Sequence, residues 1–122
     1  MPRILIVDDS PTVRRYYRGV LEKAGHQVEE AISGSEGLEK LYMEEFDLLL
    51  VDVNMPKMDG YSFLREVRRA DDLKPVPALM ISTESGVGDV DRGFRAGCNV
   101  YLVKPVETEE LLAYVELLVR WG

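Results

Sequence analysis

The sequence is poor in several features on which whole classes of protein depend. Its single cysteine, Cys98, excludes an internal disulfide and fits a reducing compartment. No apolar run approaches the roughly 18 residues that a membrane span needs, and the start, Met1-Pro2-Arg3, does not resemble a signal peptide. We therefore expect a cytoplasmic protein without membrane insertion.

Positive charge and histidine are also scarce. The 122 residues include 15 lysines and arginines against 22 aspartates and glutamates, which gives a formal net charge of −7. Direct binding to nucleic acid is not expected, because it needs a basic surface that neutralises phosphates. The only histidine, His26, stands at the very start of a predicted strand, and we expect it at the surface. A histidine-kinase role for this chain is not expected.

What the sequence does contain is an alternation of short apolar runs and amphipathic stretches. Continuous apolar runs bounded by turn residues are typical of strands buried on both faces. The fourth amphipathic stretch contains Gly86, Gly88 and Gly93, and each costs ~0.5–1 kcal/mol against alanine in a helix interior, so we expect a short or loosely held helix. The predicted strands are 3–7, 26–31, 47–53, 78–82 and 100–103. The first three predicted helices follow Ser10-Pro11, the capping box 33–36 and the Asp59-Gly60 turn. The last two lie within 84–97 and 107–121.

Strands that alternate with helices predict an α/β fold. Strands that are apolar throughout belong to a parallel sheet covered on both faces, and right-handed crossovers favour a doubly wound arrangement. We predict a flavodoxin-like (βα)5 sheet with strand order 2-1-3-4-5, formed by one domain over residues 1–122. In this order the ligand site lies at the carboxyl ends of the first and third strands.

Polar residues stand at the ends of the predicted strands. Asp8 and Asp9 end the first strand and Asp52 the third, while Ser82 and Lys104 end the fourth and fifth. Because parallel strands bring these ends to one edge, three carboxylates meet there. Two unit charges ~4 Å apart interact by ~4 kcal/mol at an effective dielectric constant of about 20, so the cluster needs cations. Lys104 supplies one, and a hard divalent ion such as Mg²⁺ prefers oxygen ligands of this kind.

Such a site suits phosphoryl transfer. A carboxylate can act as a nucleophile and form an acyl phosphate. A metal ion and a lysine stabilise the charge on the transferring group, and a hydroxyl at Ser82 can donate a hydrogen bond to it. The pattern therefore indicates a phosphoryl site centred on Asp52.

Four segments together carry a resemblance to a known family. Each alone is weak evidence, but they occur in order at the ends of the first, third, fourth and fifth predicted strands. With them the whole chain resembles a two-component response-regulator receiver domain of the single-domain, chemotaxis-protein type. The segments are Ile4-Leu5-Ile6-Val7-Asp8-Asp9-Ser10, Asp52-Val53-Asn54-Met55-Pro56-Lys57-Met58-Asp59-Gly60, Ser82-Thr83 and Tyr101-Leu102-Val103-Lys104-Pro105.

The resemblance implies a role for each polar residue at this edge. Asp52 would be the phosphoacceptor, and Lys104 would contact the phosphoryl group. Asp9, Asp52 and the backbone carbonyl of Asn54 would hold Mg²⁺, or Mn²⁺ in its place. Asp8 would act on the same ion through water.

The resemblance also implies a conformational switch. Ser82 would be the switch hydroxyl and Tyr101 the switch aromatic, and Pro105 would follow a cis peptide bond. The phosphodonor would be a phosphohistidine on a partner kinase or phosphotransfer protein. The chain would then be no conventional enzyme, because it would catalyse only its own phosphorylation and dephosphorylation.

Three positions near the site refine this expectation. Thr83 stands where the family often has alanine, and we expect it to narrow access to the phosphoryl group. Asn54 and Glu84 match fast-dephosphorylating members of the family. We therefore expect a phosphorylated state that lasts seconds to minutes.

The last predicted helix has more apolar surface than a core-facing stripe needs. Tyr114, Leu117 and Trp121 extend its apolar arc to roughly 220°, against the ≳100° typical of such a stripe. These side chains are either scattered apolar surface or part of a partner surface. The resemblance favours a partner face that also includes Tyr101, for a downstream protein, an output domain outside this sequence or a second copy.

Plainer interpretations and rival functions remain open. A flavodoxin that binds FMN needs a Ser/Thr/Gly-rich phosphate loop after the first strand, and Asp8-Asp9 would repel the nucleotide phosphate there. A phosphatase of the haloacid-dehalogenase type needs an Asp-x-Asp motif at that place, which is absent. A receiver-like module that only binds proteins would gain no phosphate from acetyl phosphate and Mg²⁺.

The polar residues of the predicted site also have a plainer structural interpretation. In it they are helix caps (Asp8, Asp9), a turn residue (Asp52), a solvated lysine (Lys104), a loop hydroxyl (Ser82) and a packing aromatic (Tyr101).

Overall fold

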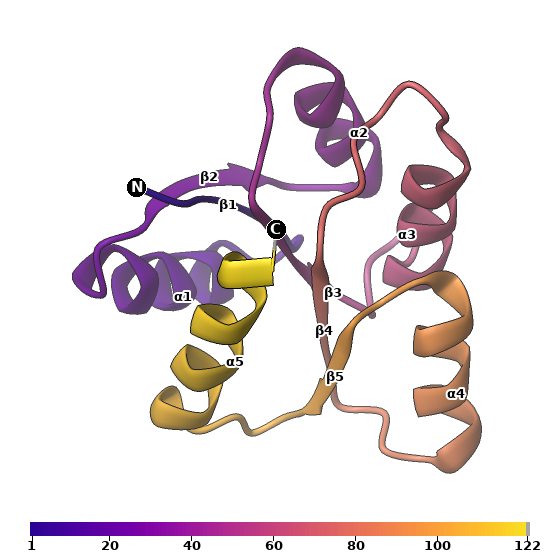
Figure 1. Ribbon diagram of the computed structural model, residues 1–122. Helices are drawn as coiled ribbons and strands as arrows, with labels where there is room; N and C mark the ends of the chain where they lie inside the picture. The colour runs from indigo at the N-terminus through magenta and orange to yellow at the C-terminus, as the bar shows by residue number, and fades with distance from the viewer. Residues whose placement is uncertain (122) are drawn as a thin grey trace.

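One parallel sheet carries the fold. The elements are β1 Arg3–Val7, α1 Pro11–Lys23, β2 Gln27–Ala31, α2 Gly34–Met43, β3 Leu48–Asp52, α3 Gly60–Arg69, β4 Ala78–Ser82, α4 Val87–Ala96, β5 Val100–Val103 and α5 Thr108–Trp121. The computed structural model describes the backbone of residues 1–121 and the side chains of residues 1–120. The strands pair in the order β2-β1-β3-β4-β5, which confirms the predicted fold class. Figure 1 shows α1 and α5 on one side of the sheet and α2, α3 and α4 on the other.

The helices begin where the sequence places capping residues. The Ser10 hydroxyl accepts a hydrogen bond from Val13 N at 3.2 Å, and Ser33 and Asp59 cap α2 and α3 in the same way. Each cap satisfies an N–H group of the first turn that has no partner within the helix. The glycine-containing α4 has 10 residues, the same length as α2 and α3, so its glycines do not shorten it relative to these helices.

Two apolar layers fix the central strands in place. Successive strand residues point to opposite faces of a sheet. Leu5, Val7, Leu49 and Val51 pack on the side of α2, α3 and α4, and Ile4, Ile6, Leu48 and Leu50 pack on the side of α1 and α5. All five residues of β3 are buried, and Val7 pairs with Val51 across the sheet. The carboxyl ends of β1 and β3 are therefore held side by side by the core itself.

One surface prediction is wrong. His26 is only 5% exposed, because the turn between α1 and β2 carries its ring to α5, where Nε2 lies 3.3 Å from Glu116 Oε1. The neighbouring residues give no sign of this burial, since the covering helix comes from the other end of the chain. The ring lies at the amino end of β2, and the predicted site lies at the carboxyl ends of the strands.

Helix α4 contacts the rest of the fold through its smallest residues. Gly93 and Ala96 are buried, while Val87 is 89% exposed and Phe94 is 49% exposed. A Cβ atom on Gly93 would lie 2.6 Å from Tyr101 Cδ2, so the helix approaches β5 more closely than an alanine would allow. The larger apolar side chains of α4 consequently face outward.

Candidate functional site

Three carboxylates meet at the carboxyl edge of the sheet. Asp8, Asp9 and Asp52 each offer one oxygen within 4.8 Å of the other two. Asp8 is 3% exposed and Asp52 is 7% exposed, whereas Asp9 faces solvent. The pairing of β1 with β3 produces this meeting, because the aspartates directly follow or end these strands. The structure thus brings together the acidic residues that the sequence predicted.

The start of α1 orients Asp8. Its Oδ1 accepts a hydrogen bond from Ser10 N at 2.8 Å, and its carbonyl oxygen accepts one from Arg14 at 2.7 Å. Ser10 in turn caps the helix with its hydroxyl. The same short turn therefore begins the helix and directs a carboxylate toward the cluster.

Lys104 contributes a positive charge from the end of β5. Its Nζ donates a hydrogen bond to Asp52 Oδ1 at 3.3 Å. Its backbone N–H donates to the Ser82 carbonyl at 2.8 Å, and its peptide bond to Pro105 is cis, as the resemblance implied. The lysine is thereby fixed at the side of the carboxylate cluster.

One lysine does not offset three carboxylates. Burial and the charge of Asp8 raise the pKa of Asp52 to about 6, although Lys104 acts in the opposite direction. Burial likewise raises the pKa of Asp8, against the hydrogen bond from Ser10. An oxygen-rich site with unbalanced negative charge fits a hard divalent cation such as Mg²⁺ or Mn²⁺.

The loop after β3 passes very close to the site backbone. A Cβ atom on Gly60 would lie 2.4 Å from the Asp52 carbonyl oxygen, so this position admits only glycine. The Gly60 N–H donates to Val53 O at 2.8 Å. The sequence indicated a turn here but not this close approach. The side chain of Asn54 lies toward β4, where its Nδ2 donates to Thr83 Oγ1 at 3.4 Å.

Ser82 and Tyr101 are joined through the backbone of one residue, Glu84. Ser82 is fully buried, and its hydroxyl accepts a hydrogen bond from Glu84 N at 2.9 Å. The Tyr101 hydroxyl donates to the Glu84 carbonyl oxygen at 3.0 Å and lies 3.1 Å from the Tyr61 hydroxyl. Sequence reasoning missed Glu84 as this link and missed Tyr61 altogether, because neither contact leaves a local pattern.

Comparison with known protein families matches residues 4–116 to the response regulator receiver domain. The chain belongs to the response regulator receiver domain family. It is 37% identical over 120 residues to the DNA-binding dual master transcriptional regulator RpaA of Synechocystis, and the matched region covers 98% of this chain and 50% of RpaA. It is 38% identical over 112 residues to protein PilH of Pseudomonas aeruginosa, and this match covers 92% of this chain and 93% of PilH.

Solved structures place the receiver in the same family. Chemotaxis protein CheY4 of Vibrio cholerae matches with a TM-score of 0.90 and 37% identity, over 97% of this chain and 98% of CheY4. The chain therefore spans half the length of RpaA but nearly all of PilH and CheY4. It is a receiver domain of two-component signalling. Among its described helices, none is long and apolar enough to cross a membrane.

The receiver exposes apolar side chains on α4, β5 and α5. Leu117 of α5 is 50% exposed, Tyr114 is half-buried against the core on the α1 and α5 side, and Val103 of β5 is 38% exposed. Val87 and Phe94 of α4 are also exposed, and the partner face predicted from the sequence did not include them. The side chain of Trp121 lies outside the described residues.

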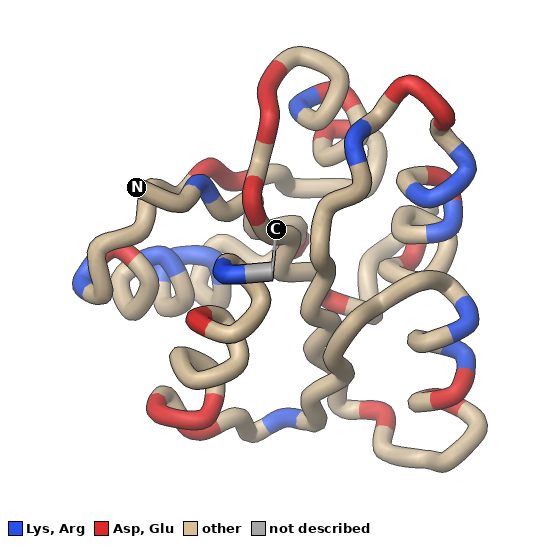
Figure 2. Tube along the Cα trace, viewed as in Figure 1, with Lys and Arg blue, Asp and Glu red and all other residues tan. Residues whose placement is uncertain are grey.

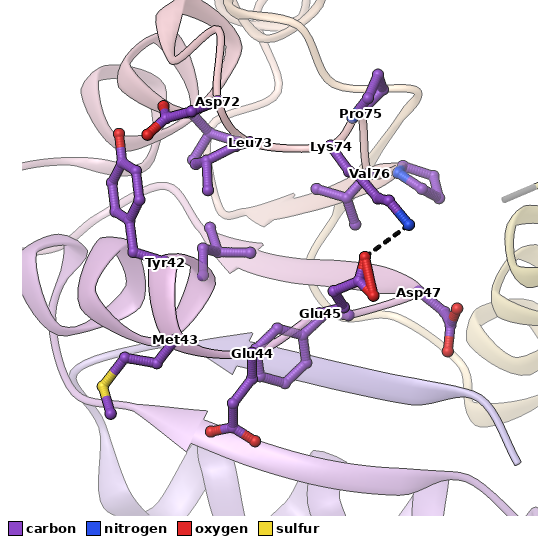
Figure 3. Close-up of a pocket in the computed structure, with 14 residues that line it drawn as sticks. Tyr42, Met43, Glu44, Glu45, Asp47, Asp72, Leu73, Lys74, Pro75 and Val76 are labelled. Carbon is purple, nitrogen blue, oxygen red and sulfur yellow. Dashed lines mark ion pairs between the residues drawn. The ribbon is translucent and has the colours of Figure 1, made fainter.

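A separate pocket lies at the other edge of the sheet. It has a volume of about 490 Å³ and lies between the end of α2 and the loops that lead into β3 and β4 (Figure 3). Lys74 pairs with Glu45 there at 2.6 Å. None of the predicted site residues lines it, so it is not part of the carboxylate site.

Proposed function

We propose that this receiver is a phosphorylation-controlled switch whose phosphoacceptor is Asp52. The observation that carries the proposal is the meeting of Asp8, Asp9 and Asp52 within 4.8 Å, with Lys104 Nζ at 3.3 Å from Asp52. The donor is a phosphohistidine on a partner kinase or phosphotransfer protein in the cytoplasm. Residues 1–122 act as one receiver domain in this proposal.

The reaction transfers a phosphoryl group between two nucleophiles. A carboxylate oxygen of Asp52 forms a bond to phosphorus while the bond from phosphorus to the donor histidine nitrogen breaks, and that nitrogen keeps the electron pair. Lys104 stabilises the negative charge on the transferred oxygens. Hydrolysis of the acyl phosphate by water later returns the carboxylate and releases inorganic phosphate.

A divalent ion fits the charge of this site. Asp8, Asp9 and Asp52 and the backbone carbonyl of Asn54 would hold Mg²⁺ or Mn²⁺, with Asp8 acting through water. When bound, the ion neutralises carboxylate and phosphoryl charge.

The phosphoryl signal passes through the backbone of Glu84. A phosphoryl group on Asp52 draws the Ser82 hydroxyl toward it as a donor, and the hydrogen bond from Glu84 N to that hydroxyl then rearranges. The carbonyl oxygen of the same residue accepts a hydrogen bond from Tyr101. A change at Asp52 thereby reaches β5 and α4.

The energetics favour a partner that recognises only the active state. A shift of the ratio of active to inactive receiver from 1:99 to 99:1 needs about 5.5 kcal/mol of differential stabilisation. A charge-assisted hydrogen bond contributes about 1.5–3 kcal/mol, so the new bonds at the site supply only part of it. The proposed partner face combines Tyr101, Tyr114, Leu117 and Trp121 with the exposed apolar residues of α4. Figure 2 shows that the first turn of α5 beside this face is acidic, where Glu109 and Glu110 lie. A downstream protein, an output domain or a second copy would bind there.

Acetyl phosphate tests the phosphoacceptor directly. We expect the native chain to gain one phosphoryl group per molecule by intact-protein mass spectrometry when Mg²⁺ is present, and much less in excess chelator. Asp52→Asn removes the nucleophile and should gain none. A native chain that stays unphosphorylated would support a module that binds proteins without phosphorylation.

A further inference from the structure

A second tyrosine, Tyr61, lies against the proposed switch residue. It is 3% exposed in the first turn of α3, and its hydroxyl oxygen lies 3.1 Å from that of Tyr101. The Tyr61 hydroxyl also lies 3.1 Å from the Asp89 carbonyl oxygen in the first turn of α4. The Tyr101 hydroxyl donates to the Glu84 carbonyl at 3.0 Å. Helix α3, helix α4 and strand β5 therefore meet at one pair of hydroxyl groups.

The two tyrosine hydroxyl groups make three close contacts with oxygen atoms, which are to each other, to the Asp89 carbonyl and to the Glu84 carbonyl. Only two protons are available for these three contacts, because each tyrosine hydroxyl carries one. The Asp89 carbonyl has a helical amide donor four residues further on, whereas the Tyr101 oxygen has Tyr61 as its only donor among the described residues. The most satisfied arrangement is a chain in which Tyr61 donates to Tyr101 and Tyr101 donates to Glu84. Burial and the Tyr101 hydroxyl raise the pKa of Tyr61 above its usual range, in keeping with a hydroxyl that donates to Tyr101.

Other contacts fix both rings without the acidic cluster. The guanidinium carbon of Arg92 lies 4.5 Å from the centroid of the Tyr61 ring, and Arg92 Nη2 lies 3.9 Å from Asp59 Oδ2. The Tyr101 ring packs against Gly93 on the opposite side. These contacts and the hydroxyl chain involve neither a carboxylate of the site nor Lys104.

We propose that Tyr61 is a positioning residue of this switch, whose hydroxyl favours the packed position of Tyr101 against α4 by the same factor before and after phosphorylation of Asp52. The inference rests on the proposed function, because it assigns Tyr61 a part in the regulation of the same site. Loss of one neutral hydrogen bond changes an equilibrium about threefold to tenfold. Removal of the Tyr61 hydroxyl should therefore lower the ratio of packed to unpacked Tyr101 by that factor, with or without phosphorylation.

The test follows the ring of Tyr101 by NMR in protein labelled with ¹³C on tyrosine rings. Tyr101→Phe assigns the signal, and Gly93→Ala gives the reference for a displaced ring, because its added methyl group occupies the space of the ring. In Tyr61→Phe, which keeps the ring under Arg92, we expect the Tyr101 signal to move toward that reference. Tyr42→Phe, the same change at an exposed tyrosine of α2, should leave it in place. Each spectrum is recorded without and with Mg²⁺ and beryllofluoride, an analogue of the phosphoryl group.

A second measurement distinguishes the specific loss of this hydrogen bond from a general loosening of the fold in Tyr61→Phe. Hydrogen exchange of the α4 amides in Tyr61→Phe, Tyr101→Phe and the double variant should be non-additive, because both single changes break the same bond. An unmoved Tyr101 signal in Tyr61→Phe, an equal movement in Tyr42→Phe, or additive exchange would each overturn the inference. Absence of a response to beryllofluoride in the native chain would instead contradict the proposed function, and the spectra without it still measure whether Tyr61 holds the ring.

Discussion

At the scale of single residues, Asp52 is the proposed centre of the chemistry. Burial and the charge of Asp8 raise its pKa to about 6, against the opposing effect of Lys104. Its ordinary pKa is 3.8, so between these two values the folded chain binds more protons than the unfolded chain. The free energy of unfolding consequently falls as the pH rises through this range. Asp52 therefore destabilises the folded receiver at neutral pH, as expected of a group that is kept for its reactivity.

Asp52→Asn should stabilise the receiver at pH 7 in the absence of divalent ions. The change of the carboxyl pKa from 3.8 to about 6 corresponds to about 3 kcal/mol, and solvent screening at the open edge reduces the expected gain to about 1–2 kcal/mol. Urea unfolding at pH 7 and pH 4 checks this, because the gain should shrink at the lower pH. The exposed Asp71→Asn is the matched control, and an equal gain there would contradict the explanation.

Thr83 belongs to the same scale, because we expect it to narrow access to Asp52. Its hydroxyl accepts a hydrogen bond from Asn54 across the mouth of the site. Thr83→Ala should increase the rate of phosphorylation by acetyl phosphate about two- to tenfold, which corresponds to a barrier lower by up to ~1.4 kcal/mol. Thr83→Ser keeps the hydroxyl and removes only the methyl group. A rate in Thr83→Ala that equals the native rate would count against the narrowing effect.

At the scale of elements, local pattern predicted most of the structure. The apolar runs and the caps at Ser10 and Asp59 are local signals, and the observed elements follow them. The burial of His26 and the pairing of Tyr61 with Tyr101 could not be predicted in this way. Each arises where two elements distant in sequence pack together.

The same reasoning explains which parts of the site were predictable. Strand ends share one edge of a parallel sheet, so the meeting of Asp8, Asp52 and Lys104 follows from topology alone. The link through the backbone of Glu84 depends on the conformation of one loop. No residue type at that position announces a backbone contact.

Gly60 gives an element-scale test of how tightly the β3–α3 loop is packed. Gly60→Ala would place a Cβ atom 2.4 Å from the Asp52 carbonyl oxygen and 2.8 Å from Val53 Cα, and backbone atoms cannot move aside cheaply. We expect a loss of about 2–4 kcal/mol in the free energy of unfolding. Gly88→Ala in α4 meets nothing within 4 Å and should gain about 0.5–1 kcal/mol. Urea unfolding of both variants checks the pair, and similar values would disagree with the packing described.

At the scale of the whole molecule, the proposed metal links the site to global stability. A ligand that binds only the folded state adds about 1.4 kcal/mol to the free energy of unfolding when its concentration is ten times its Kd. Mg²⁺ should therefore raise the melting temperature of the native receiver, and a chelator should reverse the rise. Asp9→Asn removes an exposed carboxylate of the cluster and should remove most of the effect. An equal rise in that variant would point to ionic strength rather than to this site.

Two-component signalling requires that an event at Asp52 reaches a surface on which partners can bind. The proposed route runs from Ser82 through Glu84 to Tyr101 and α4. Figure 1 shows β5 between α4 and α5, the three elements that carry the exposed apolar residues of the proposed partner face. The switch and the proposed partner face are therefore neighbours in the fold.

The most direct test of the switch is amide NMR of the whole receiver before and after addition of Mg²⁺ and beryllofluoride. The account predicts changes at Asp52 and Lys104 that extend to Glu84, Tyr101 and the amides of α4, and none of this extension in Asp52→Asn. Changes confined to the residues of the acidic cluster, or the same pattern in Asp52→Asn, would contradict it.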